Sequence, residues 1–225
     1  NAEDIAAFLV EPIQGEAGVY VPNDGYLAKA KELCKANNVL FIADEVQTGI
    51  ARTGKMLAVD HENVKPDILV LGKALSGGMY PVSAVLANNE IMNVIKPGQH
   101  GSTYGGNPIA CAVAIAALDV VVKENLAQHS EEMGQLFRAE IEKIIEKTDL
   151  IQSVRGKGLL NAILINDTPE SSTAWNFCLA LKENGLLAKP THGNIIRLAP
   201  PLVITKDQLM ECVQIIEKTI LEFQK

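Results

Sequence analysis

The sequence predicts an α/β fold that is followed by a smaller α+β part. Its first half holds short, continuous apolar runs at residues 5–10, 39–43 and 68–71, separated by a helical pattern or by long loops. Such runs are typical of strands covered on both faces, as in a parallel sheet flanked by helices. The second half alternates amphipathic helical patterns with short strand patterns, which indicates a separate α+β unit.

The remaining elements of the first half follow from local patterns. Apolar residues at helical spacing predict a helix over roughly residues 25–37, and a further strand is expected at residues 81–87. Residues 108–123 are predicted to form a long apolar helix, because proline is well suited to a first helical turn. We place the domain boundary at the start of this helix. Residues 1–107 form the first domain, and residues 108–225 form the linking helix and the second, smaller domain.

The second half contains two strongly amphipathic helical patterns. The first covers residues 126–147, and the second is predicted to start at Thr205, because Gln208 three residues on completes a capping-box pattern. Trp175 is expected in the core of this half. Short strands are expected between the helices, at residues 152–154, 160–165, 186–189 and 195–198.

Composition limits the classes of function. The formal net charge is −7 and no cluster of lysine and arginine stands out, which argues against nucleic acid or an anionic membrane as partner. The longest apolar stretch, residues 111–122, contains Asp119 and is too short to span a bilayer. The four cysteines form no C-x-x-C pair and the four histidines show no metal-ligand spacing, so we expect reduced thiols, no metal, and a reducing cytosol or organelle matrix.

Three ionisable residues, Glu11, Asp44 and Lys73, follow the three apolar runs of the first half. Ligands of open α/β sheets bind beyond the carboxyl ends of the strands. Lys73 stands between Gly72 and apolar residues, where desolvation would lower the pKa of its amine and make it a better nucleophile toward carbonyl groups. By position alone, a lysine that extends into solvent from a strand end is an equally good interpretation.

Two nucleotide-binding motifs can be excluded. A P-loop would need glycine where Asp67 stands and serine or threonine where Ala74 stands. The dinucleotide fingerprint fails as well, because Asn161 occupies the third glycine position after Gly156 and Gly158.

Several ordered blocks of sequence resemble the class III, fold-type I aminotransferases, which depend on pyridoxal phosphate (PLP). The blocks are EPIQGEAG at residues 11–18, ADEVQTG at 43–49, RTG at 52–54, LGKALSGG at 71–78 and GSTYGGNP at 101–108. The resemblance implies that residues 1–107 form the second half of a mostly parallel PLP-binding large domain. A smaller α+β carboxyl-terminal domain would follow.

The resemblance implies a role for each matching residue near the cofactor ring. Lys73 would bind PLP covalently and later transfer a proton, and Asp44 would pair with the protonated pyridine nitrogen. Gln47 would hydrogen-bond the phenolic oxygen of the ring, and Val46 would pack against one ring face.

Further roles implied by the resemblance concern the phosphate and the substrates. Ser102 and Thr103 would donate to the PLP phosphate from the neighbouring subunit, which implies a homodimer with shared active sites. Glu16 and Arg197 would pair while the amine substrate is bound, and a freed Arg197 would then bind the carboxylate of a 2-oxo acid. An ordinary salt bridge between domains is the alternative interpretation of this pair.

The segments GLLAKPTHG at residues 185–193 and IRLAPPL at 196–202 resemble the family members that act on ornithine. This implies transfer of the δ-amino group of L-ornithine to a 2-oxo acid such as 2-oxoglutarate, giving glutamate-5-semialdehyde and an amino acid. Class III enzymes for N-acetylornithine or 4-aminobutyrate remain alternatives, as does a fragment without activity.

The beginning of the chain is unusual for a complete member of this family. It starts at Asn1 with a strand pattern close behind, so we expect a piece of a longer or processed protein. The family's phosphate loop, ring-stacking aromatic residue and α-carboxylate contacts all precede this point. A chain of these residues alone would be expected to bind PLP poorly and to expose sheet edges and apolar surface.

Overall fold

The computed structural model describes residues 2–223, which fall into two compact units. Unit 1 comprises Asn1–Pro12, Pro22–Ile50 and Lys55–Asn125, whereas unit 2 comprises Ile13–Val21, Ala51–Gly54 and Leu126–Lys225. The helix at residues 108–123 therefore belongs to unit 1. The expected domains at 1–107 and 108–225 stay a prediction, because compact units divide the chain by contacts and need not coincide with domains.

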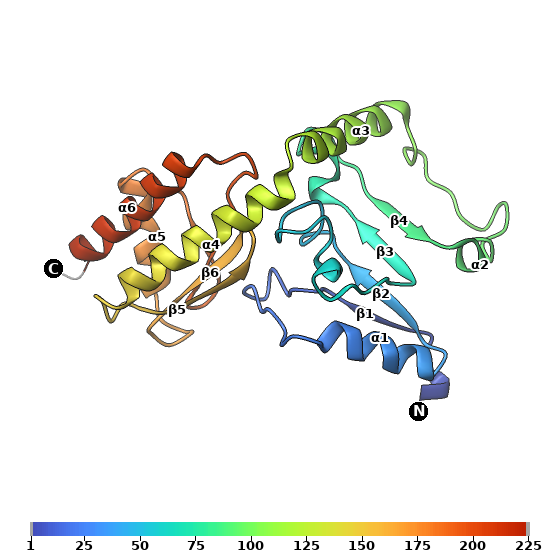
Figure 1. Ribbon diagram of the computed structural model, residues 1–225, viewed down its shortest axis with the longest axis horizontal. Helices are drawn as coiled ribbons and strands as arrows, with labels where there is room; N and C mark the ends of the chain where they lie inside the picture. Colours follow the sequence, from blue (N-terminus) through green and yellow to red (C-terminus); the bar gives the residue numbers. More distant parts are fainter. Residues whose placement is uncertain (1, 224–225) are drawn as a thin grey trace. The chain divides into compact units, whose positions relative to one another are not determined.

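Unit 1 is built on a four-stranded sheet in the order β1-β2-β3-β4 (Figure 1). The first three strands are parallel, and β4 is antiparallel to β3. The strands are β1 (Ala7–Val10), β2 (Leu40–Asp44), β3 (Ile68–Leu71) and β4 (Ala84–Ala87). The helices are α1 (Tyr26–Ala36), α2 (Asn89–Met92) and α3 (Pro108–Lys123), with short 3-10 helices η1 (Ala2–Asp4), η2 (Ala58–Glu62) and η3 (Lys73–Ser76).

The core of unit 1 lies between α1 and the sheet. Leu27 and Cys34 of α1 pack with Phe41 and Ala43 of β2, all of them buried. Phe41 and Ala43 are two residues apart, so both side chains point to the same face of the strand. This burial fixes the register of β2, and with it the place where the strand ends at Asp44.

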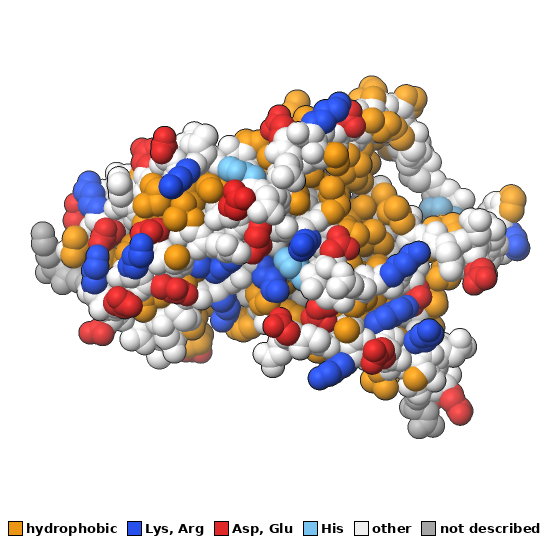
Figure 2. All heavy atoms as spheres, viewed as in Figure 1, with side chains coloured by type: hydrophobic (Ala, Val, Ile, Leu, Met, Phe, Trp, Pro, Cys, Tyr) orange, Lys and Arg blue, Asp and Glu red, His pale blue; other side chains and the backbone are white. Residues whose placement is uncertain are grey.

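Much apolar surface of unit 1 is exposed, as expected of a chain that holds these residues alone, and its edge strands are not covered on both faces. Leu9 of β1 and Val85 of β4 are each 59% exposed, and on α3 Ile115 and Val122 are 64% and 65% exposed. Figure 2 shows hydrophobic side chains gathered at the surface of this unit. Leu9 and Val85 lie on the edge strands β1 and β4, and the described part of the chain supplies nothing that covers these two positions or the two on α3.

Unit 2 is an α+β unit with an entirely antiparallel sheet in the order β5-β6-β8-β7. Its strands are β5 (Ile151–Lys157), β6 (Leu160–Ile165), β7 (Lys189–His192) and β8 (Ile195–Leu198). Its helices, α4 (Leu126–Ile145), α5 (Thr173–Glu183) and α6 (Lys206–Phe223), contribute with the sheet to one core. Strand β7 begins at Lys189, later than predicted, and the exposed Leu187 precedes it.

Helix α5 was not predicted, and the expectation for Trp175 is wrong. Ala174, Phe177, Cys178 and Leu181 of this helix are buried, whereas Trp175 is 57% exposed. The buried positions follow the i, i+3, i+4, i+7 spacing of one helical face, and Trp175 lies off that face. The periodicity of the neighbouring apolar residues indicates this exposure.

Local signals at the other helices were reliable. At the start of α6 the Gln208 N–H donates to Thr205 Oγ1 at 3.2 Å and Thr205 N–H donates to Gln208 Oε1 at 3.0 Å, so the predicted capping box is confirmed. Helix α3 begins at Pro108 as predicted, with the Asn107 side chain accepting from Ala110 N–H. None of the described helices is both long and apolar enough to cross a membrane.

Candidate active site

The carboxyl ends of β2 and β3 bring two of the predicted residues to one edge of the sheet. Asp44 is the last residue of β2, and Lys73 follows β3 after a single glycine. The two strands are parallel neighbours with Asp44 opposite Val70, and Glu45 N–H donates to the Val70 carbonyl at 2.9 Å. The structure therefore places a carboxylate and an amine where open α/β sheets bind ligands.

Lys73 has a strained backbone. Its φ is +40°, in the left-handed region that side chains other than glycine rarely adopt. Lys73 opens the 3-10 helix η3, where Leu75 N–H donates to the Gly72 carbonyl at 3.0 Å. The residue is exposed in this structure, and its positive φ is a feature that the sequence did not reveal.

Little room is left for a side chain at Gly72, the residue between β3 and Lys73. A Cβ atom at Gly72 would lie 3.3 Å from Cγ1 of Val46, closer than most real Cβ contacts. Gly72 is itself buried. The turn after β2 therefore comes close to the turn after β3, where Val46 approaches Gly72.

Asp44 ends β2, and Val46 and Gln47 lie in the turn that follows it. Val46 N–H donates to Oδ1 of Asp44 at 3.0 Å, which holds the carboxylate against its own turn. All three side chains are half-buried. This set fits PLP: an acid for the pyridine nitrogen, an amide for the phenolic oxygen, an apolar contact for the ring face and, across the turn, the Lys73 amine for the aldehyde.

Glu45 anchors this turn through hydrogen bonds of its buried side chain, a role that the sequence pattern did not assign to it. Its side chain is almost fully buried, at 1% exposure. Oε2 accepts from the Thr48 hydroxyl and Oε1 accepts from Val59 N–H at 2.9 Å, which ties the turn to η2. Burial raises the pKa of the Glu45 carboxyl, and the hydrogen bonds from Thr48 and Val59 oppose that shift only in part. The sequence held an indication of this hydrogen bond, because Thr48 follows Glu45 by three positions.

Ser102 and Thr103 lie in a turn of their own. Both are exposed, and Ser102 Oγ accepts from Gly105 N–H at 2.9 Å. The connection between α2 and α3 that carries them runs apart from the strands in Figure 1. The structure thus does not add these residues to the group around Lys73, and their contact with a phosphate in a neighbouring subunit stays a prediction.

Glu16 and Arg197 form an ion pair within unit 2. Arg197 Nη1 lies 2.6 Å from Oε2 of Glu16, although the residues are far apart in sequence. The hydrogen bond and the positive charge of Arg197 lower the pKa of the Glu16 carboxyl. Both residues belong to unit 2, so the pair does not bridge the two compact units.

The loop that carries Glu16 is fixed at several points. Gln14 and Tyr20 exchange backbone hydrogen bonds of 3.1 and 3.0 Å across the base of this loop. The Arg155 guanidinium donates to the Gly18 carbonyl and lies 4.2 Å from the centroid of the Tyr20 ring. The expected structural role of Arg155 agrees with these contacts, since they hold the loop against the sheet of unit 2.

Arg52 is a second residue whose role the sequence did not reveal. Its guanidinium donates to the Leu159 carbonyl at 3.1 Å and to the Pro200 carbonyl at 2.6 Å. Ser130 Oγ donates to the Arg52 carbonyl and accepts from Leu159 N–H, both at 3.0 Å. Burial lowers the pKa of Arg52 to about 10, which leaves the side chain charged at neutral pH. Arg52 thus anchors the chain that follows Arg197.

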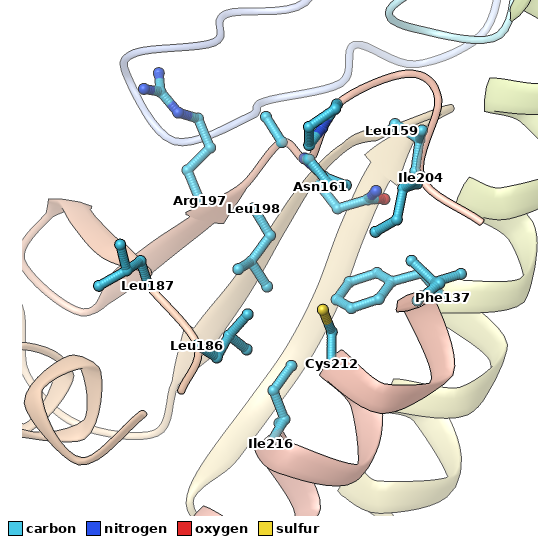
Figure 3. A pocket seen from close by; sticks show the side chains of 14 residues that line it. Phe137, Leu159, Asn161, Leu186, Leu187, Arg197, Leu198, Ile204, Cys212 and Ile216 are labelled. Atoms are coloured by element: carbon cyan, nitrogen blue, oxygen red, sulfur yellow. The ribbon is translucent and has the colours of Figure 1, made fainter. Parts of the chain in front are cut away.

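A cavity of about 290 Å³ lies beside Arg197 in unit 2. Its lining is mostly apolar and includes Phe137, Leu186, Leu198 and Cys212. Figure 3 shows the guanidinium of Arg197 turned away from the space enclosed by these side chains. The cavity therefore offers an apolar surface, and the charged end of Arg197 faces Glu16 instead.

Comparisons with known proteins agree with this arrangement. The family described as aminotransferase class-III matches residues 1–220. Mitochondrial ornithine aminotransferase of Rattus norvegicus is 63% identical over 220 residues, which are 98% of this chain and 49% of that protein. The same enzyme of Drosophila melanogaster is 65% identical over 218 residues, 97% of this chain and 49% of the fly protein. The chain thus spans about half the length of the curated relatives it matches.

Solved structures share the fold. A structure described as acetylornithine aminotransferase from Elizabethkingia anophelis is 80% identical, with a TM-score of 0.97, over 99% of this chain and 58% of that one. Ornithine aminotransferase from Toxoplasma gondii ME49 is 49% identical, with a TM-score of 0.93, over 99% of this chain and 52% of that one. The predicted fold class, part of a PLP-transferase α/β domain followed by a smaller α+β domain, is confirmed.

Proposed function

The chain belongs to the class III aminotransferase family, and on this premise we propose that the full-length protein is a PLP-dependent ornithine δ-aminotransferase. It would transfer the δ-amino group of L-ornithine to 2-oxoglutarate or another 2-oxo acid, giving glutamate-5-semialdehyde and an amino acid. The observation that carries this proposal is the placement of Lys73 and Asp44 at the ends of neighbouring parallel strands. PLP, when bound, supplies a ring that withdraws electrons from the substrate carbon next to the amine.

Residues of the two turns would bind and orient the cofactor. Asp44 keeps the pyridine nitrogen protonated, because a carboxylate beside it favours the charged form. Val46 supports one face of the ring, and Gln47 donates to the phenolic oxygen. Lys73 holds the cofactor through Nζ and, once released from it, moves a proton at that atom to and from the substrate. Ser102 and Thr103 of a second subunit would hold the phosphate.

The ion pair of Glu16 and Arg197 would let one pocket accept two unlike substrates. Paired with Glu16, Arg197 does not attract the α-carboxylate of ornithine, so the δ-amino end can enter. Released from Glu16, it offers the bidentate geometry that suits the carboxylate of a 2-oxo acid. The exposure of Glu16, at 59% of its side chain, leaves it room to move.

A second candidate substrate is N-acetylornithine, favoured by the 80% identity to the structure described as acetylornithine aminotransferase. Both reactions move a δ-amino group, so Lys73, Asp44 and the ion pair serve either one. Ornithine is preferred here because the curated relatives from rat and fly are named for it and because residues 185–193 resemble that branch.

A direct assay separates the candidates. The full-length enzyme is given L-ornithine or N-acetylornithine with 2-oxoglutarate, and kcat/KM is measured for each. A higher kcat/KM for ornithine is expected, and a preference for the acetylated amine would reverse the choice. The Lys73→Ala variant should lose the visible absorption of lysine-bound cofactor, and an unchanged spectrum would disprove the assignment of this lysine.

The proposal includes a homodimer with shared sites in a reducing compartment, cytosol or organelle matrix. The exposed turn of Ser102 and Thr103 supports a contact with a second subunit. The cysteine spacing supports a reducing compartment, and the rat and fly relatives are named as mitochondrial.

A further inference from the structure

Strand pairing in unit 2 sets two cations side by side. Lys189 of β7 is the cross-strand partner of Arg197 of β8. Side chains of directly opposed residues lie on the same face of a sheet, with Cβ atoms about 4.5–5.5 Å apart, and like charges so placed destabilise the pair. A carboxylate beside them relieves this repulsion, and Glu16 is the acid that pairs with Arg197.

The backbone of Glu16 is attached to the same strand as Lys189. The Thr191 hydroxyl of β7 donates to the Glu16 carbonyl at 2.5 Å. The charges of Lys189 and His192 act on Glu16 alongside Arg197, and all of them lower the pKa of its carboxyl. The Glu16 side chain can therefore turn from one cation to the other while the Glu16 carbonyl keeps its hydrogen bond to Thr191 of β7.

A carboxylate leaves an arginine more readily when a second cation can receive it. Losing the Arg197 partner without replacement would cost Glu16 a charge-assisted hydrogen bond. His192 is placed less well than Lys189, because the register shifts between Pro190 and His192 and His192 pairs with Ile195. Lys189, by contrast, pairs directly with Arg197 across the two strands, so it is the better placed cation.

We propose that Lys189 receives the Glu16 carboxylate when a 2-oxo acid takes its place on Arg197. This inference rests on the proposed function, because it assumes that Glu16 and Arg197 separate during the second half-reaction. Lys189 acts through Glu16 and does not contact substrate, so it is a positioning residue. Its effect is to ease the displacement of Glu16, and so to strengthen the apparent binding of the oxo acid.

The test uses the full-length holoenzyme with Lys189→Gln, which removes the charge and keeps most of the side-chain length. Each half-reaction is followed separately through the absorption of the cofactor. KM for 2-oxoglutarate should rise about threefold, the size expected when a partly exposed ion pair is lost. The half-reaction with the amine substrate should keep its rate, because Glu16 stays on Arg197. Lys182→Gln, at an exposed lysine of α5, is the matched control. It should change neither KM for 2-oxoglutarate nor the rate of the amine half-reaction.

A double-mutant cycle distinguishes this role from direct binding of the oxo acid. In a Glu16→Gln background there is no carboxylate to receive, so Lys189→Gln should leave KM for 2-oxoglutarate unchanged. The same threefold rise in both backgrounds would show that Lys189 contacts the oxo acid itself and would overturn the proposal. A slowed amine half-reaction in Lys189→Gln would overturn it too. A wild-type enzyme that reacts with neither ornithine nor N-acetylornithine would instead refute the proposed function.

Discussion

Individual residues of the site are positioned by contacts that the motif alone did not reveal. The order of Asp44, Gln47 and Lys73 along the chain predicted which residues meet at the carboxyl ends of β2 and β3. The sequence could not show that Lys73 is exposed with a φ of +40°, or that Glu45 is buried. The burial of Glu45 depends on its contact with Val59 of η2, and the neighbouring Thr48 is the one part of this arrangement that the local sequence could have indicated.

Glu45 should make the stability of the full-length enzyme depend on pH. Its folded-state pKa is raised above the usual 4.5, so the folded state holds the proton more tightly than the unfolded state. The stabilisation is fully present below pH 4.5 and is lost as pH rises through the raised pKa. Urea unfolding across pH should show this loss in the wild type and a flatter profile in Glu45→Gln. Equal slopes in the two proteins would argue against the shift.

Gly72→Ala should weaken cofactor binding. The new Cβ would lie 3.3 Å from Val46 Cγ1 and would displace this side chain, which is proposed to pack against the PLP ring. Overpacking of this kind costs about 1–3 kcal/mol, part of which would appear as a higher dissociation constant for PLP. Equilibrium titration of the full-length apoenzyme measures that constant. Adding Val46→Ala to Gly72→Ala makes space for the new Cβ but removes the side chain proposed to pack against the ring. The double variant should therefore recover the free energy of unfolding more than the affinity for PLP.

At the scale of elements, strong local signals predicted the structure well and weak ones did not. The predicted strands at residues 68–71, 160–165 and 195–198 have the bounds of β3, β6 and β8. Each is rich in apolar residues, and each is a strand with a neighbour on both sides in its sheet. β7 was misplaced because Leu186 and Leu187 suggested a strand, whereas pairing with β8 begins at Lys189. Edge strands take their register from a single neighbour, so sequence constrains them less.

Helix α5 offers a direct test of which face is buried. Phe177→Ala should destabilise the full-length protein by about 3–5 kcal/mol, because its ring is fully buried and its removal leaves a cavity. Trp175→Ala on the same helix should change the free energy of unfolding by no more than about 0.5 kcal/mol, because that side chain is 57% exposed. Chemical denaturation measures both. A larger loss at Trp175 than at Phe177 would mean that the helix is rotated or that a subunit contact covers the indole.

At the scale of the whole molecule, the residues proposed to bind PLP fall into two separate groups. Lys73 and Asp44 meet at one sheet edge, whereas Ser102 and Thr103 stand exposed in a separate turn. The proposed dimer predicts that these two groups function together only across subunits, since a closed twofold assembly places the same residues at each of its two sites. Two inactive variants of the full-length enzyme can test this.

Lys73→Ala and the double variant Ser102→Ala with Thr103→Val should each be inactive or nearly so as homodimers. When the two are unfolded together and refolded at equal concentration, about half of the dimers are mixed, and each mixed dimer has one site with both groups intact. Activity should therefore recover to about one quarter of the wild-type value. If both groups came from one subunit, every site would lack one of them and mixing would restore nothing. Refolded wild-type enzyme gives the reference, so that recovery reflects the pairing of subunits and not the yield of refolding.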